Sequence, residues 1–184
     1  MTAKKSARVN ATDRRAGIVD AAIEEFAAWG LAGASIERVA ARVGISQPYV
    51  YRLFSSKKEL FLAALDEITA RISTAFTDAV DGRPADEALT AMGEAYLGLL
   101  ARRSEPLMLL QGIATGADEE TRARVRDNFR TLTEQVRNAS GASEPEVRHF
   151  FAFGMLATVG TAIDMPELAA PAETFRPDND HKEN

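Results

Sequence analysis

Apolar residues recur along this chain at spacings of three and four, the pattern of amphipathic α-helices. Residues 13–29 carry a short stripe and residues 57–80 a long one, and the long stripe consists of Phe61, Leu65, Ile68, Ile72 and Phe76. Similar stripes follow in residues 86–103, 104–114, 118–141 and 143–164. The pattern therefore predicts an all-α fold. The helix over residues 57–80 is too long for a small N-terminal domain alone, so we expect it to join two domains.

Two short helical patterns meet at residues 43–46, Val-Gly-Ile-Ser. Ser35 can cap the first helix through its hydroxyl, and Gly44 can end it because glycine adopts the left-handed conformation without strain. Ser46 can cap the second helix, with Pro48 in the first turn, where no helical N–H is missed. Two helices joined by such a turn form a helix-turn-helix, whose second helix enters the DNA major groove.

The second helix has an outer face suited to DNA. Val50, Leu53 and Phe54 share its inner face, which leaves Gln47, Pro48, Tyr49, Tyr51 and Arg52 pointing outward. A glutamine can pair with adenine, an arginine with guanine, and tyrosines can contact thymine methyls or phosphate oxygens. The alternative is a short surface helix with its tyrosines half-buried against neighbouring residues.

Residues 14–61 resemble the DNA-binding domain of the TetR family of bacterial transcription regulators. The matching residues are Ile18-Val19-Asp20-Ala21-Ala22, Phe26, Gly30, Ser35-Ile36, Val39-Ala40, Val43-Gly44-Ile45-Ser46, Tyr51, Phe54, Ser56-Lys57 and Leu60-Phe61. The resemblance implies phosphate contacts by Ser35, Tyr51 and Lys57. It implies contacts to bases or backbone by Gln47, Pro48, Tyr49 and Arg52, and Ser46 at the start of the same helix joins these candidates.

Two positions depart from the family pattern and one local motif supports it. Ala34 stands where the family often has threonine, and Leu53 where it often has histidine or tyrosine, so DNA contacts at these two positions are in doubt. Ser56 and Glu59 are spaced as a capping box, which would put Lys57 at a helix start near the duplex.

The last helical pattern, residues 143–164, is apolar on more than one face and contains several small residues. A helix of this kind is buried on two sides, and the second side can be another subunit. TetR-like proteins commonly dimerise through their last two long helices, in agreement with this. The predicted interface residues are Phe150, Gly154, Ala157, Thr158 and Thr161; the alternative is a central helix of a monomeric core.

The resemblance also implies a small-molecule pocket in the second domain. Candidate lining residues come from three helices and are mostly apolar, with a hydroxyl and an amide to orient a ligand: Met92, Tyr96, Met108, Leu109, Gln111 and Phe129. Such a lining predicts a medium-sized, apolar effector. Methionines and aromatic residues at helical spacing are equally typical of an ordinary core.

Charge divides the chain into two parts. Residues 1–60 hold ten Lys or Arg and six Asp or Glu, a net +4, whereas the remaining residues hold twelve and twenty-one, a net −9. One end is therefore suited to phosphate. We expect a flexible basic arm at 1–12, a DNA-binding domain at 13–60, an effector and dimerisation domain at 61–165 and a flexible tail at 166–184. The arm could reach a minor groove, or it could simply be a basic start.

Composition excludes several classes of protein. There is no cysteine, and His149 and His181 are the only histidines, so thiolate metal sites and cysteine nucleophiles are ruled out. No nucleophile motif or phosphate-binding loop is present, and we expect neither an enzyme nor a cofactor. No apolar run is long enough to span a membrane and no signal peptide opens the chain, which predicts a cytoplasmic protein.

The sequence thus predicts a homodimeric repressor that binds double-stranded DNA at a palindromic operator and is released by a small, largely apolar effector. The alternative is a DNA-binding regulator without such an effector, controlled by its abundance or by a protein partner.

Overall fold

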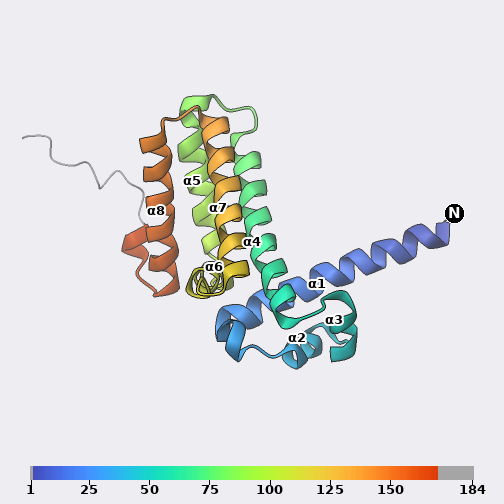
Figure 1. Ribbon diagram of the computed structural model, residues 1–184. Helices are drawn as coiled ribbons and strands as arrows, with labels where there is room; N and C mark the ends of the chain where they lie inside the picture. Colours follow the sequence, from blue (N-terminus) through green and yellow to red (C-terminus); the bar gives the residue numbers. More distant parts are fainter. Residues whose placement is uncertain (1, 170–184) are drawn as a thin grey trace, which may run out of the picture.

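The computed structural model describes residues 2–169, and every regular element in that range is helical, as the sequence predicted (Figure 1). The three helices of the N-terminal domain are followed by a long connecting helix and four further α-helices. The elements are α1 (Thr2–Gly33), α2 (Ile36–Val43), α3 (Gln47–Leu53), α4 (Lys57–Val80), η1 (Ala85–Glu87), α5 (Ala88–Leu100), α6 (Ser104–Ala114), α7 (Glu119–Ser140), α8 (Glu144–Ala162) and η2 (Pro166–Ala169).

Helix α1 begins earlier than its apolar pattern indicated. The backbone of residues 2–12, where we expected a flexible arm, is helical and continuous with the rest of α1, and in Figure 1 this part projects away from the body of the protein. Gly30 interrupts the other end, with φ 63° and ψ 178°. This left-handed φ suits glycine alone, so the chain can turn there toward α2.

Helix α4 connects the two parts of the molecule. Near its start Phe61 packs edge-to-face on Phe26 of α1, with ring centroids 5.0 Å apart. Farther along, Ile68, Ile72 and Phe76 are buried where α5 and α7 pack against α4. The predicted stripe is therefore the inner face of a helix that contributes to both domains.

Helix α6 lies across the end of α1 and forms much of the contact between the two domains (Figure 1). Arg71 of α4 binds Glu67, Glu105 at the start of α6 and Asp20 of α1. Glu24 of α1 accepts a 2.6 Å hydrogen bond from the Ser104 hydroxyl. These polar contacts tie the N-terminal domain to the rest of the molecule.

The face of α8 that the sequence analysis assigned to a second subunit is in fact the inner face of the helix. Ala157 and Thr158 have no exposed surface, and the Thr158 hydroxyl lies 2.6 Å from the Tyr96 hydroxyl of α5. Phe150 packs on Phe76 and Gly154 faces the Tyr96 ring. These residues face the interior of the same subunit, and Thr161 is half-buried. Helix α8 is apolar on two faces, and its sequence alone does not determine which of these faces packs against the core.

The outer face of α8 is nevertheless apolar in its second half. Leu156 and Ile163 are 46 % and 56 % exposed, and Ala152 is exposed one turn before Leu156. The small residue Gly160 serves a different purpose, because η2 packs there and a Cβ on Gly160 would lie 2.7 Å from Leu168 Cβ. Residues 166–169, which we expected in a flexible tail, thus form a short helix on α8. The remainder of the expected tail lies outside the described residues.

None of the helices described over residues 2–169 has the length and apolar character needed to cross a membrane.

Candidate nucleic-acid interface and ligand cavity

Helices α2 and α3 are positioned by local signals in the sequence. Ser35 accepts a 3.3 Å hydrogen bond from the Arg38 backbone N–H, and Gly44 ends α2 with φ 72°. The N–H of Ile45 then returns to the Ala40 carbonyl at 3.0 Å. Ser46 precedes α3 as predicted, but its hydroxyl makes no capping bond, so it remains exposed at the start of that helix. These features give a helix-turn-helix with a tight corner.

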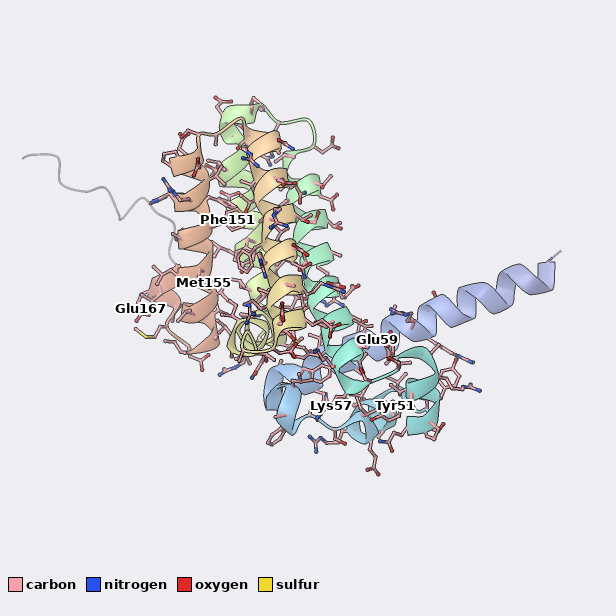
Figure 2. All side chains as sticks on the ribbon, in the orientation of Figure 1. Tyr51, Lys57, Glu59, Phe151, Met155 and Glu167 are labelled. Atoms are coloured by element: carbon pink, nitrogen blue, oxygen red, sulfur yellow. The ribbon has the colours of Figure 1, made fainter. Side chains whose placement is uncertain are left out.

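The outer face of α3 presents the side chains that the sequence analysis placed there. Gln47, Pro48, Tyr51 and Arg52 are exposed and Tyr49 is half-buried. The Arg52 guanidinium lies 4.6 Å from the centre of the Tyr49 ring. Val50 and Phe54 are buried on the opposite side, as predicted, while Leu53 is half-buried. Tyr51 therefore lies on the free surface of the N-terminal domain, far from the residues labelled on α8 (Figure 2).

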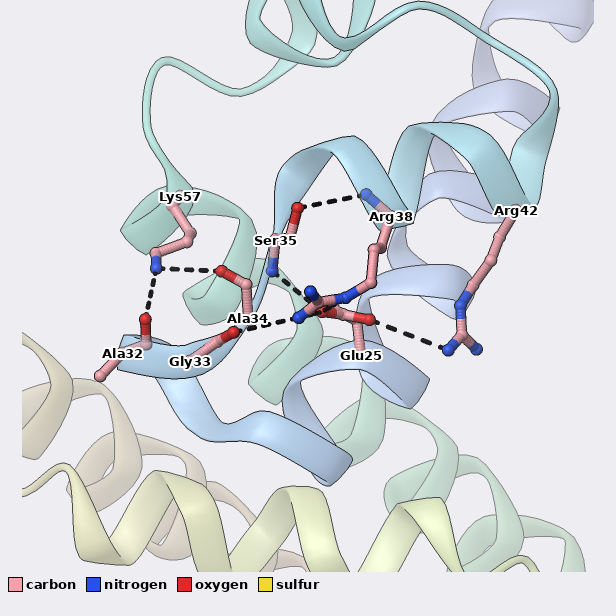
Figure 3. Close-up of polar contacts among 8 residues, drawn as sticks. All are labelled: Glu25, Ala32, Gly33, Ala34, Ser35, Arg38, Arg42 and Lys57. Carbon is pink, nitrogen blue, oxygen red and sulfur yellow. Dashed lines mark hydrogen bonds and ion pairs between the residues drawn. The ribbon is translucent and has the colours of Figure 1, made fainter.

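Lys57 lies at the start of α4 and also binds the end of α1. Its ammonium donates to the carbonyl oxygens of Ala32 and Ala34, at 3.0 and 3.1 Å (Figure 3). These carbonyls lie where α1 ends, so they have no partner within the helix. Lys57 has a structural role in addition to any contact with phosphate.

The expected capping box at the start of α4 forms only in part. Ser56 accepts a hydrogen bond from the Glu59 N–H at 3.0 Å, as predicted. The Glu59 carboxylate, however, binds the backbone and hydroxyl of Ser55 instead of returning to Ser56. These hydrogen bonds hold the pKa of Glu59 below its ordinary value. The Glu59 carboxylate reaches Ser55 instead of the Ser56 backbone, and the spacing of the motif alone does not distinguish these two partners.

Glu25 is a buried acid that the sequence analysis did not single out. Its side chain has no exposed surface, and it accepts hydrogen bonds from the Ser35 N–H at 2.9 Å and the Arg38 Nε at 2.7 Å (Figure 3). Burial would raise the pKa of Glu25, but these hydrogen bonds and the charges of Arg38 and Arg42 bring it below the ordinary value. A signal was available: Glu25 lies seven residues after Ile18, so it falls on the apolar face of α1.

An apolar cavity lies in the second domain, between α4, α5, α6, α7 and α8. It has a volume of about 60 Å³ and is lined by Leu65, Thr69, Ile72, Phe76, Tyr96, Leu109, Val125, Asn128, Phe129, Leu132, Phe150, Phe151, Gly154 and Met155. Phe151 and Met155 are seen on α8 in Figure 2. Of the predicted ligand residues, Tyr96, Leu109 and Phe129 line this cavity.

The other three predicted ligand residues lie elsewhere. Met92 and Met108 are fully buried and belong to the core outside the cavity. Gln111 of α6 lies against the kink of α1, where a Cβ on Gly30 would come within 2.8 Å of its side-chain oxygen. Helical spacing identified the inner faces of these helices but not the point along each helix where the packing leaves a gap.

The polar groups in the cavity wall are already paired. The Tyr96 hydroxyl bonds to Thr158, Thr69 donates to the Leu65 carbonyl at 2.9 Å, and Asn128 donates to Asp66 at 3.3 Å. Burial raises the pKa of Tyr96, so its hydroxyl stays neutral. The wall therefore offers a ligand mainly apolar contact.

The chain is similar to known bacterial regulators, most clearly over its N-terminal domain. Residues 18–64 match the family described as "Bacterial regulatory proteins, tetR family". The transcriptional activator FasR of Mycolicibacterium smegmatis is 31 % identical over 111 residues, 58 % of this chain and 49 % of FasR. The transcriptional regulator EthR of the same organism is 34 % identical over 83 residues, 45 % of this chain and 38 % of EthR. The chain thus spans about half or less of these two relatives.

The similarity of the fold extends farther than that of the sequence. The crystal structure of the transcriptional regulator FadR from Bacillus subtilis, in complex with stearoyl-CoA, matches 86 % of this chain and 93 % of its own with a TM-score of 0.72. Sequence identity over that match is 15 %. The two-domain helical architecture is therefore shared, and the matched proteins are regulators rather than enzymes.

Replacing Lys57 by alanine should lower the free energy of unfolding by about 1–2 kcal/mol, because two carbonyls at the end of α1 lose a charged donor. Thermal unfolding followed by circular dichroism measures the change. Arg14→Ala is the matched control, since Arg14 is an exposed cation of α1 with no hydrogen bond or ion pair to the other described residues. Equal melting of the two variants would mean that the Lys57 contacts contribute nothing to stability.

Proposed function

Because this chain belongs to the TetR family of bacterial regulatory proteins, we propose that it is a homodimeric, sequence-specific transcription regulator released from a palindromic operator by a small, largely apolar effector. Where the operator overlaps a promoter, such a protein is a repressor. The observation that carries the proposal is the exposed face of α3, where Gln47, Tyr51 and Arg52 stand clear of the core. Exposed aromatic, amide and guanidinium groups on a recognition helix are the groups that read the major groove.

The neighbouring contacts support a defined placement of this face on DNA. Ser35 and Lys57 lie at the starts of α2 and α4, where backbone N–H groups favour anions. Residues 1–60 carry the positive excess, whereas the rest of the chain is negative. The N-terminal domain would therefore approach the phosphates while the remainder of the molecule is repelled.

A second copy of the chain is the proposed partner of the outer face of α8. Leu156 and Ile163 are spaced by seven residues, so both lie on one side of the helix. Burying this stripe against its own copy, with α7 alongside, would give a four-helix interface with two-fold symmetry. A dimer of this kind presents two recognition helices to two half-sites.

The proposed effector is an apolar molecule that enlarges the cavity. The present volume of about 60 Å³ is well below the roughly 300–1,000 Å³ of ligand pockets, so a ligand must part the helices to enter. FadR was crystallised with stearoyl-CoA, and an acyl chain has the chemistry that this apolar wall would accept. A ligand that fits only the enlarged form shifts the population toward that form.

Helix α6 is the proposed connection between the cavity and the DNA-binding domain. Leu109 lines the cavity, and two residues later Gln111 lies against the kink at Gly30. The next residue of α6, Gly112, packs closely on the cavity wall, since a Cβ at that position would lie 2.6 Å from Leu65 Cδ2. Widening of the cavity would therefore displace α6, and with it the segment of α1 that leads to α2.

Selection of bound fragments from random duplex DNA tests the proposed function. We expect an enriched palindrome whose half-site centres lie about 10 base pairs, or a multiple of that, apart. Tyr51→Ala should lose the enrichment while keeping its melting temperature. Arg52→Gln should relax the preference at particular base positions, whereas Arg126→Gln, which removes the same charge from the exposed face of α7, should leave the preference unchanged. If the wild-type protein enriches no sequence, it is not a sequence-specific regulator.

Replacing Leu156 by glutamate should convert the dimer into a monomer, because it places a charge in the centre of the proposed interface. Sedimentation velocity distinguishes the two states. Ile113→Glu is the control, since Ile113 is an apolar residue of similar exposure, 43 %, that belongs to α6 rather than to α8. A Leu156→Glu variant that still sediments as a dimer would show that the subunits meet through another face.

Gly154→Leu should fill the cavity beside Tyr96, and the variant should bind its operator without responding to an effector. Stearoyl-CoA and stearate are the probes, and displacement from the operator is followed by fluorescence anisotropy. Gly98→Leu is the control, because no atom outside the helix lies within 4 Å of a Cβ at that position. If neither stearoyl-CoA nor stearate displaces the wild-type protein from its operator, the result would instead favour a regulator that has no small apolar effector.

A further inference from the structure

A single buried carboxylate lies beneath the first helix of the helix-turn-helix. Glu25 Oε1 accepts the hydrogen bonds from Ser35 and Arg38, while its Oε2 has no hydrogen bond from the described residues and lies 3.8 Å from the Arg42 guanidinium. A buried charge is tolerated only when it is paired, and here two arginines of α2 supply the pairing. Figure 3 shows both arginine side chains directed from α2 toward this carboxylate.

The two arginines are held at the surface without being enclosed. The side chains of Arg38 and Arg42 are 49 % and 48 % exposed. Arg38 has further restraints, since it donates to the Gly33 carbonyl at 3.0 Å and lies 5.4 Å from the centre of the Trp29 ring. Both arginines belong to α2, and the first helix of such a motif crosses the DNA backbone. At this position the long side chains of Arg38 and Arg42 would reach phosphates if they were not bound to Glu25.

We propose that Glu25 is a positioning residue that increases DNA selectivity by holding Arg38 and Arg42 on the protein side of α2. The proposal rests on the function proposed above. Contacts to phosphate strengthen binding to every sequence alike, and they therefore reduce the ratio of specific to non-specific affinity. With both arginines engaged by Glu25, discrimination depends more strongly on the side chains of α3.

Glu25→Gln tests this directly, because glutamine keeps the size and one acceptor oxygen but loses the charge. The matched control is Glu37→Gln, which removes the same charge from the exposed side of α2; Glu37 has no ion pair within the described part of the chain. Binding to a random-sequence duplex is measured against salt concentration. We expect the slope for Glu25→Gln to exceed that of the control by about one to two, since each additional phosphate contact adds about 0.9. Equal slopes would overturn the proposal.

A second measurement requires no DNA. Trp29 is the only tryptophan and is 60 % exposed, with Arg38 over its ring. Release of Arg38 in Glu25→Gln should change the emission of Trp29, and Glu37→Gln should leave it unchanged. If the wild-type protein bound no duplex even at low salt, the proposed function would fail, yet the emission would still report whether Glu25 restrains Arg38.

Arg42→Gln leaves the hydrogen bonds from Ser35 and Arg38 to Glu25 in place, so this variant should still fold. If Glu25 already restrains Arg42, the substitution should leave the salt slope of non-specific binding unchanged. A decrease of about one would show that Arg42 contacts phosphate in the wild-type protein, and the proposed restraint would then be wrong.

Discussion

The structure depends on one helix, α4, whose buried side chains join the N-terminal domain and the second domain in a single hydrophobic cluster. The first turns of α4 place Leu60 and Phe61 among the residues of the N-terminal domain, and later turns place Ile72 and Phe76 beneath α5, α7 and α8. A helix transmits a rotation or shift along its length because its backbone hydrogen bonds resist bending. Neither domain can therefore rearrange around α4 without changing the position of the other.

The remaining contacts between the two domains are concentrated where α6 crosses α1, and several of them are polar. Arg71 connects three helices, and Lys58 binds Asp118 and Glu120 at the start of α7, both at 2.8 Å. The hydrogen bond from Lys58 is the main reason that the pKa of Asp118 falls to about 2. Charged pairs of this kind are individually weak at a surface and can exchange partners. The interface thus combines a rigid apolar connection through α4 with polar contacts that can be rearranged.

Much of this could be predicted from the sequence because it is local. The caps of α2, the left-handed Gly44 and the inner face of α3 each depend on residues within one or two turns. Predictions failed where the partner of a side chain lies far away in the sequence. Lys57 binds carbonyls 23 and 25 residues away, and the Thr158 hydroxyl bonds to Tyr96 of the same subunit, where the sequence had predicted a contact with another subunit. Gln111 could not be placed without knowing that Gly30 lies beside it. Helical periodicity indicates on which face of a helix a residue lies, but it does not identify the residue that packs against it.

The cavity also has a mechanical consequence. Apolar voids of this kind remain dry, and they are lost when a protein unfolds or its helices collapse. A void of about 60 Å³ corresponds to about 36 mL/mol, within the range of volume changes that make folded proteins sensitive to pressure. The second domain is therefore the compressible part of this molecule. A ligand that fills the void would make that domain stiffer and would reduce its response to hydrostatic pressure.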